Sequence, residues 1–154
     1  MRCYKRKEVG DSFTSLKRSG GIAKRIMNPV ELKYNKNHEY AKVEGNIVML
    51  GITDHAQKSL GDVVFVELPD EGATVTAGKS YGTVESVKAV SDISASVSGR
   101  VVEVNTQVLD TPDLLNSDPY GEGWLIKVEV DDFSPLEGMM TVVEYETFLT
   151  EEEH

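Results

Sequence analysis

The most informative part of the chain is a stretch near its middle, Gly82-Thr83-Val84-Glu85-Ser86-Val87-Lys88-Ala89-Val90-Ser91-Asp92. Two segments of strand-like composition, residues 79–87 and 89–97, meet here, so Lys88 lies where a β-hairpin would turn. Within residues 80–94 Lys88 is the only basic residue. A lysine at a turn is most often a solubilising group. An isolated ammonium on a rigid hairpin is also a suitable site for enzymatic acylation, and composition alone leaves both interpretations open.

The chain on either side of this hairpin contains further short strand patterns separated by turn residues. Residues 42–50 alternate and are interrupted by Glu-Gly-Asn at 44–46, which predicts a hairpin. Residues 63–68 form a β-branched run that stops at Pro-Asp-Glu-Gly, and residues 100–104 form another candidate strand. In residues 124–130 the side chains of Trp124, Ile126, Val128 and Val130 would fall on one face of a strand, with Lys127 and Glu129 on the other. Several short strands at this spacing predict a β-sandwich or barrel rather than a parallel α/β sheet.

Helix signals are few and short. Residues 53–60 are bounded by Thr53 as an N-cap and Gly61 as a C-terminal stop. Thr111 stands before Pro112 as the cap of a second, very short helix. Residues 141–144 have the spacing of a capping box and lead into a C-terminal helix. The fold class predicted from these patterns is mainly β with short peripheral helices and a C-terminal helix.

Charge divides the chain into two parts. The 154 residues carry a formal net charge of −10, yet residues 1–26 hold eight basic and two acidic side chains. We interpret residues 1–26 as a basic N-terminal extension, which its composition predicts to be disordered, and residues 27–154 as the globular domain. The extension could precede a true start at Met27, or be an organelle transit peptide or a basic arm. A start at Met27 fits a bacterial cytoplasmic protein, and a transit peptide fits a mitochondrial one.

Composition also bears on the classes of function. The acidic body argues against a nucleic-acid partner, and the chain has no apolar run of the roughly eighteen residues that a membrane helix needs. A single cysteine excludes a disulfide framework. The three histidines form no metal-ligand pair, and neither a phosphate-binding loop nor a nucleophile elbow is present. We therefore expect a protein that presents a group to other proteins, and neither an enzyme nor a metalloprotein.

From Glu31 to its C-terminus the sequence resembles the H protein family of the glycine cleavage system. The segments that carry the resemblance are 32–34 (LKY), 38–40 (HEY), 51–53 (GIT), Gln57, 60–62 (LGD), 66–69 (VELP), 85–89 (ESVKA), 98–99 (SG), 102–105 (VEVN) and 116–124 (NSDPYGEGW). Biotin carriers flank their lysine with methionines, whereas Val87 and Ala89 stand here. One departure is Tyr40, where the family commonly has tryptophan.

The resemblance implies a fold, a cofactor and a set of partners. The expected fold is a barrel-sandwich hybrid, a lipoyl/biotinyl-type hairpin β-sandwich. (R)-Lipoic acid would be joined covalently to Lys88 as N6-lipoyllysine. The arm would carry the aminomethyl group from the P protein (glycine decarboxylase) to the T protein (aminomethyltransferase), and the L protein (dihydrolipoyl dehydrogenase) would reoxidise it. A lipoate ligase or octanoyltransferase would attach the group, and the H protein itself would be a non-catalytic carrier.

Two acidic residues are further candidates on the same grounds. Family positions that match Glu39 and Asp92 lie near the aminomethyl group of the loaded arm, where a carboxylate can hold the protonated amine. Asn37 and Ser59 are weaker candidates beside the same cleft. Without the resemblance, Glu39 and Asp92 would be ordinary surface acids that contribute little to stability. An alternative function also stays open, in which the protein donates or relays lipoyl groups to other lipoate-dependent enzymes.

Overall fold

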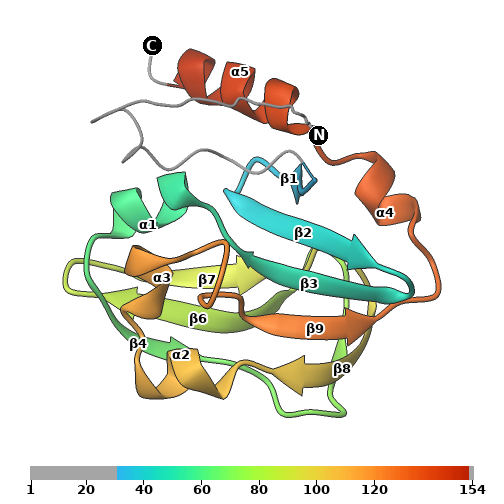
Figure 1. The fold of residues 1–154 in the computed structure, drawn as a ribbon, viewed down its shortest axis with the longest axis horizontal. Coiled ribbons are helices and arrows are strands. Elements are labelled where there is room, and N and C mark those ends of the chain that lie inside the picture. Colours follow the sequence, from blue (N-terminus) through green and yellow to red (C-terminus); the bar gives the residue numbers. More distant parts are fainter. Residues whose placement is uncertain (1–30, 153–154) are drawn as a thin grey trace.

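The computed structural model describes residues 31–152, so the extension predicted for residues 1–26 lies outside the described residues. Two antiparallel sheets form the body of the molecule (Figure 1). The larger sheet has the order β1 (Lys33–Tyr34), β2 (Glu39–Glu44), β3 (Ile47–Ile52), β9 (Ile126–Glu129), β8 (Gly99–Val104) and β5 (Thr74–Val75). The smaller sheet has the order β4 (Val63–Glu67), β6 (Ser80–Ser86) and β7 (Val90–Ser94).

Short helices cover the ends and edges of the two sheets. They are α1 (Asp54–Leu60), α2 (Thr106–Asp110), α3 (Leu114–Ser117), α4 (Ser134–Glu137) and the longer C-terminal α5 (Val142–Glu152). The mainly β fold with short helices and a C-terminal helix confirms the class predicted from the sequence. No helix in the described part of the chain is long and apolar enough to cross a membrane.

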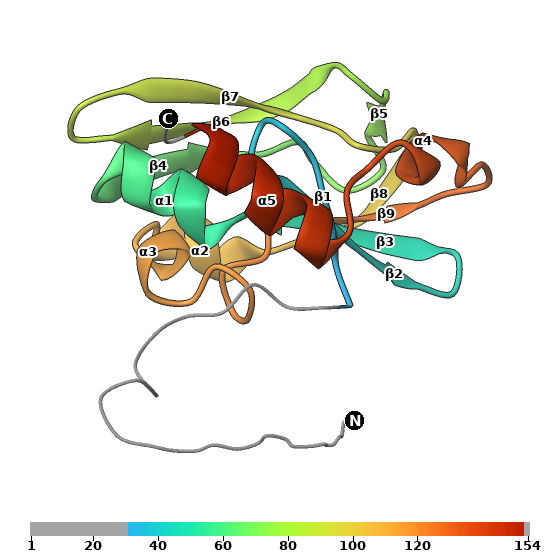
Figure 2. The ribbon, with the colours of Figure 1, turned by 90° about the horizontal axis from the view of Figure 1, so that it is seen from above.

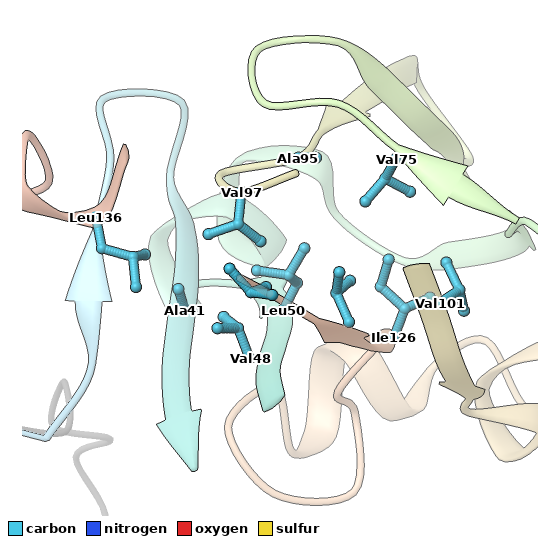
Figure 3. Packing of buried hydrophobic residues seen from close by; sticks show 11 residues of the cluster. Ala41, Val48, Leu50, Val75, Ala95, Val97, Val101, Ile126 and Leu136 are labelled. Atoms are coloured by element: carbon cyan, nitrogen blue, oxygen red, sulfur yellow. The ribbon is translucent and has the colours of Figure 1, made fainter. Parts of the chain in front are cut away.

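Three clusters of buried side chains hold these layers together. The first lies on the larger sheet and contains Ala41, Val48, Leu50, Val75, Ala95, Val97, Val101, Ile126, Val128, Val130 and Leu136 (Figure 3). The second joins the smaller sheet to α2 and α3 through residues such as Val66, Val84 and Leu115. The third packs Tyr145 of α5 against Tyr34 and Tyr40. Full burial of one aliphatic side chain contributes about 1.5–3 kcal/mol, so the clusters dominate stability.

Most of the local signals in the sequence act as predicted. The β2–β3 turn contains Gly45 with a positive φ of 65°. Helix α1 begins after Thr53, whose hydroxyl accepts a hydrogen bond from the Ala56 amide at 3.2 Å. Helix α5 begins with a reciprocal capping box, because the Thr141 amide donates to Glu144 and the Glu144 amide donates to the Thr141 hydroxyl. These signals involve residues close together in the chain, so they can be predicted from the sequence without the fold.

One helix prediction is wrong. Thr111 does not cap a helix that starts at Pro112; it ends α2, and α3 begins only at Leu114. Helix α2 was not predicted. Its cap is Asn105, whose side-chain oxygen accepts from the Gln107 amide at 3.1 Å. Both helices are too short to show an apolar period, so their positions follow from packing on the smaller sheet.

Tyr40, the departure from the family pattern, lies on β2. Its side chain extends to the segment before Trp124. It is fully buried, and its hydroxyl donates to the Pro119 carbonyl at 2.7 Å. Its ring lies over Gly51, where an added Cβ would come within 2.5 Å of the ring. Tyrosine therefore packs here as a large aromatic ring whose polar end has a partner.

Strands β6 and β7 form a hairpin whose turn lies at one end of the molecule. Both views place this turn at the end opposite the β2–β3 turn and α4 (Figures 1 and 2). Lys88 belongs to that turn, between Ser86 at the end of β6 and Val90 at the start of β7. The fold thus presents Lys88 at a projecting end of the smaller sheet.

Candidate functional site

The turn that holds Lys88 is organised by the side chain of Ser86. The Ser86 hydroxyl oxygen accepts hydrogen bonds from the amides of Lys88 at 3.2 Å and Ala89 at 3.1 Å. The Ser86 amide donates to the Ala89 carbonyl at 2.8 Å, and the Val87 amide donates to the Asp62 carbonyl at 3.0 Å. The main chain at Lys88 is therefore held in place, while its side chain is exposed.

We predict that Ser86→Ala loosens this turn without unfolding the protein. The substitution removes the acceptor of two partly buried amides, so the free energy of unfolding should fall by about 1 kcal/mol. Amide hydrogen exchange at Lys88 and Ala89 should become faster. Ser98→Ala is the matched control, because the Ser98 hydroxyl accepts from the Ala77 amide on a different loop. Unchanged exchange at Lys88 in the Ser86 variant would contradict this role.

A second group of contacts fixes the segment next to the lysine. The side chain of Asn116 accepts from the Val63 amide at 2.9 Å and donates to the Gly61 carbonyl at 2.8 Å. Gly61 has a φ of +79°, which favours glycine, and a Cβ there would lie 3.7 Å from Cε of Lys88. Asn116 lies within one of the segments that carry the family resemblance, but only the fold reveals this contact.

A cavity of about 180 Å³ lies between β2, α1 and the β6–β7 hairpin. Its lining consists of Asn37, His38, Glu39, Ile52, Ala56, Ser59, Leu60, Val84, Ser91, Asp92 and Ile93. The four residues proposed from the resemblance to lie near a cleft, Glu39, Asp92, Asn37 and Ser59, thus surround one space. The wall formed by β7 begins at Ser91, three residues after Lys88.

Glu39 is buried, so the expectation that it is a surface carboxylate is wrong. Only 5% of the residue is exposed. One carboxylate oxygen accepts from the Asn35 side-chain amide at 2.9 Å, and the other accepts from the Ser94 main-chain amide at 2.9 Å. Asn35 precedes β2 and Ser94 ends β7, so the two segments close over the carboxylate. Each oxygen can accept a second hydrogen bond, which leaves acceptor capacity for a cation in the cavity.

Burial raises the pKa of Glu39 above its ordinary value of 4.5, and its two hydrogen bonds, with Asn35 and Ser94, oppose that rise. Because the native pKa exceeds the unfolded value, the native state binds more protons than the unfolded state between the two pKa values. We therefore make a prediction about the difference in free energy of unfolding between wild type and Glu39→Gln. Wild type should be most favoured over the variant below pH 4.5, and this difference should fall as the pH rises through the native pKa of Glu39. Denaturant titrations of both proteins across that range measure the difference, and the opposite slope would show that the hydrogen bonds outweigh burial.

Asp92 occupies a different environment from Glu39. It is exposed, and it pairs across β6–β7 with Thr83. Strand β7 is the edge of the smaller sheet, so one side of Asp92 faces solvent at the rim of the cavity. The two carboxylates therefore lie at different depths, with Glu39 in the buried wall and Asp92 at the opening.

The sequence did not identify the polar groups that position Glu39. The Asn35 side chain also accepts from the amides of Asn37 and Glu39, which makes a tight turn before β2. His38 ends that turn with a positive φ of 65°, and its Nδ1 lies 2.9 Å from the Tyr145 hydroxyl of α5. The Asn-Lys-Asn run at 35–37 is a turn signal that could have been read. No pattern in the sequence predicts the contact between His38 and Tyr145 of α5, which are 107 residues apart.

An exposed lysine on a hydrogen-bonded hairpin turn, beside a cavity with a buried carboxylate, is the arrangement expected of a protein that carries a group on a lysine arm. Residues 32–152 match the family model described as glycine cleavage H-protein. The chain belongs to this family, whose members are the non-catalytic, aminomethyl-carrying lipoyl proteins of the glycine cleavage system. The resemblance inferred from the sequence is confirmed.

Several relatives support this assignment. The chain is 56% identical over 124 residues to the glycine cleavage system H protein of Carboxydothermus hydrogenoformans, covering 80% of this chain and 95% of the relative. It is 54% identical over 123 residues to the mitochondrial glycine cleavage system H protein 2 of Arabidopsis thaliana, covering 80% and 79%. The crystal structure of a glycine cleavage system H protein from Mycobacterium marinum matches with a TM-score of 0.74 at 41% identity, covering 80% of this chain and 99% of that one.

Proposed function

We propose that Lys88 is the residue that carries the lipoyl group, joined through an amide to its ε-nitrogen. The observation that supports this assignment is the exposure of Lys88 on a turn held by Ser86, next to the cavity that contains Glu39. Lys88 is also the only basic residue of the hairpin. A modifying enzyme can reach its nitrogen without opening the fold.

The residues around the cavity fit such a group. Ile52, Leu60 and Val84 provide apolar walls for a hydrocarbon arm, and the opening lies on the same hairpin as Lys88. The eight-carbon acyl chain of lipoic acid, added to the lysine side chain, is long enough to follow β7 to that opening. When attached, the lipoyl group supplies a disulfide that accepts the one-carbon fragment on one sulfur.

Glu39 and Asp92 would hold the protonated amine of the aminomethyl cargo. Glu39 is already oriented by Asn35 and Ser94, so it needs little rearrangement to accept a charge-assisted hydrogen bond. Asp92 would act at the solvent-exposed rim. A cargo held in this way is kept from water while the carrier moves between enzymes.

The partners implied by this function are the P, T and L proteins, together with a lipoate ligase or octanoyltransferase. The first three would meet the arm in turn, and tethering raises the effective concentration of the cargo at each. We propose no nucleic-acid or membrane partner, and the acidic composition of residues 27–154 is consistent with partners that are proteins.

We propose that residues 1–26 are an extension before a start at Met27, with a transit peptide as the alternative. Alignments of about 122 residues account for 98% of the Acinetobacter baumannii relatives, which leaves little in them to match the extension. A start at Met27 would fit a bacterial cytoplasmic protein and a transit peptide a mitochondrial one, and the mitochondrial relative from Arabidopsis thaliana also has residues outside its alignment, which covers 79% of it.

The experiment that tests the lipoyl assignment is the intact mass of the protein purified from its own host, followed by peptide mapping. The expected result is one lipoyl amide located on Lys88. A protein without that increment, or with the group on another lysine, would overturn the assignment.

A further inference from the structure

The outer face of the smaller sheet exposes an apolar surface around the hairpin turn. It consists of four residues, here called the tip patch, with the exposed fractions Val64 51%, Phe65 52%, Val87 70% and Val90 67%. The register places Phe65 opposite Glu85 and Glu85 opposite Val90, so the three side chains form one row across the strands. Large apolar side chains that gather in this way mark interaction sites more often than isolated ones do.

The patch results from an irregularity in the β4–β6 pairing. The register shifts between Val63 and Phe65, so that Val63 is buried while the next two residues are both exposed. A regular strand would have turned one of them inward. The bulge thus adds Val64 to the exposed row without disturbing the buried side, which is a recognised effect of such bulges near functional sites.

Acidic residues lie within and around the patch. Glu85 lies in the middle of the row, Asp92 lies two residues along β7 from Val90, and Glu67 ends β4. A two-fold contact between copies of this chain through the patch would bring the two Glu85 side chains together, which disfavours a second copy as the occupant. The complementary partner has an apolar surface with basic groups opposite Glu85 and at its rim.

The length of the Lys88 side chain distinguishes the enzyme that acylates it from the enzymes that use the finished lipoyl arm. The unmodified side chain has four methylene groups, so an enzyme that acylates Lys88 must bring its active site close to the turn. In that step the unprotonated ε-amine attacks the carbonyl carbon of an acyl adenylate. The new C–N bond forms as the bond to the phosphate oxygen breaks, AMP leaves, and the nitrogen loses its extra proton. Enzymes that use the finished arm react at its sulfur end, a full lipoyl-lysine length from the main chain, so their chemistry does not by itself require the active site to reach the turn.

We propose that the tip patch is the docking surface for the enzyme that acylates Lys88, whose contact region combines apolar side chains with basic groups opposite Glu85 and at the rim. This inference rests on the proposed function of Lys88. Phe65 is its best test, because it is 23 residues away from Lys88 in the chain and makes no hydrogen bond within the turn. Its removal should affect docking and leave the attachment point intact.

The experiment measures acylation of the unmodified full chain by a purified lipoate–protein ligase with ATP and lipoate, followed by intact mass. Phe65→Ser should lower kcat/KM for the protein substrate by about tenfold or more, mainly through KM, as loss of an apolar contact at an interface centre does. Val64→Ser should act in the same direction. Val43→Ser and Val143→Ser are matched controls, because both residues are exposed valines outside the patch, and their kcat/KM should stay within about twofold of wild type.

The outcomes separate the two proposals. If wild type is not acylated at Lys88, the proposed function fails. If wild type is acylated and Phe65→Ser is acylated equally well, only the docking surface is overturned. A wild-type dimer that Phe65→Ser dissociates would also overturn it, because the patch would then be a dimer interface. So would a fully lipoylated Phe65→Ser protein that is acylated normally but has a raised KM with the P protein. Thermal unfolding midpoints equal to wild type confirm that the variants are folded.

Discussion

Lys88→Arg is expected to abolish lipoylation and, with it, all glycine cleavage activity supported by this protein. The guanidinium keeps the positive charge but stays protonated, so it cannot form the lipoyl amide. Because the side chain at this position is exposed, the free energy of unfolding should change by no more than about 0.5 kcal/mol. Intact mass after incubation with ligase, ATP and lipoate measures the first effect. Glycine-dependent release of carbon dioxide with the P, T and L proteins measures the second.

Lys79→Arg is the matched control for this experiment. Lys79 is exposed and stands nine residues before Lys88, outside the turn. It should be lipoylated and active like wild type. A lipoyl mass increment that persists in Lys88→Arg would show that another residue carries the group, and would falsify the assignment.

Glu39→Gln is expected to shorten the lifetime of the aminomethyl-loaded protein by about tenfold, the scale of one lost charge-assisted hydrogen bond. Glutamine has nearly the same shape but no charge to hold the protonated amine. It also has a single acceptor oxygen, so it cannot accept from both Asn35 and Ser94. The variant should therefore lose stability as well, which an exposed acid would not. The measurement loads fully lipoylated protein with glycine and P protein, removes the P protein, and follows intact mass over time.

Glu44→Gln provides the control on the same strand. Glu44 ends β2, faces solvent and pairs weakly with Lys42 at 3.5 Å. Its variant should decay at the wild-type rate, at a temperature where all three proteins are folded. Equal decay in Glu39→Gln and Glu44→Gln would leave Glu39 as a buried structural acid with no role toward the cargo.

Because Glu39 is buried, its substitution changes the stability of the fold as well as any contact with the cargo. Its carboxylate belongs to the packing between the turn before β2 and the end of β7, so substitution acts on structure and cargo together. The pH dependence described above separates the two effects. A purely structural acid changes the free energy of unfolding with pH, whereas a cargo ligand also changes the decay rate of the loaded form.

The sequence by itself determined the hairpin, the position of Lys88 on its turn, and most of the strands and helix caps. Turn chemistry and alternation act between residues a few positions apart, so Gly45, Thr53 and the Thr141–Glu144 capping box are predicted correctly. Helices α2 and α3 were missed or misplaced because segments this short have too few residues to show a period.

Only the tertiary structure decided which side chains lie together around the lysine. The buried Glu39 accepts a hydrogen bond from Ser94, 55 residues later, and Asn116 accepts from the Val63 amide across 53 residues. The bulge that exposes both Val64 and Phe65 depends on the pairing of β4 with β6. Such contacts form only when distant segments pack, and the free energy that fixes them comes from burial across the whole molecule. No pattern within one segment specifies them.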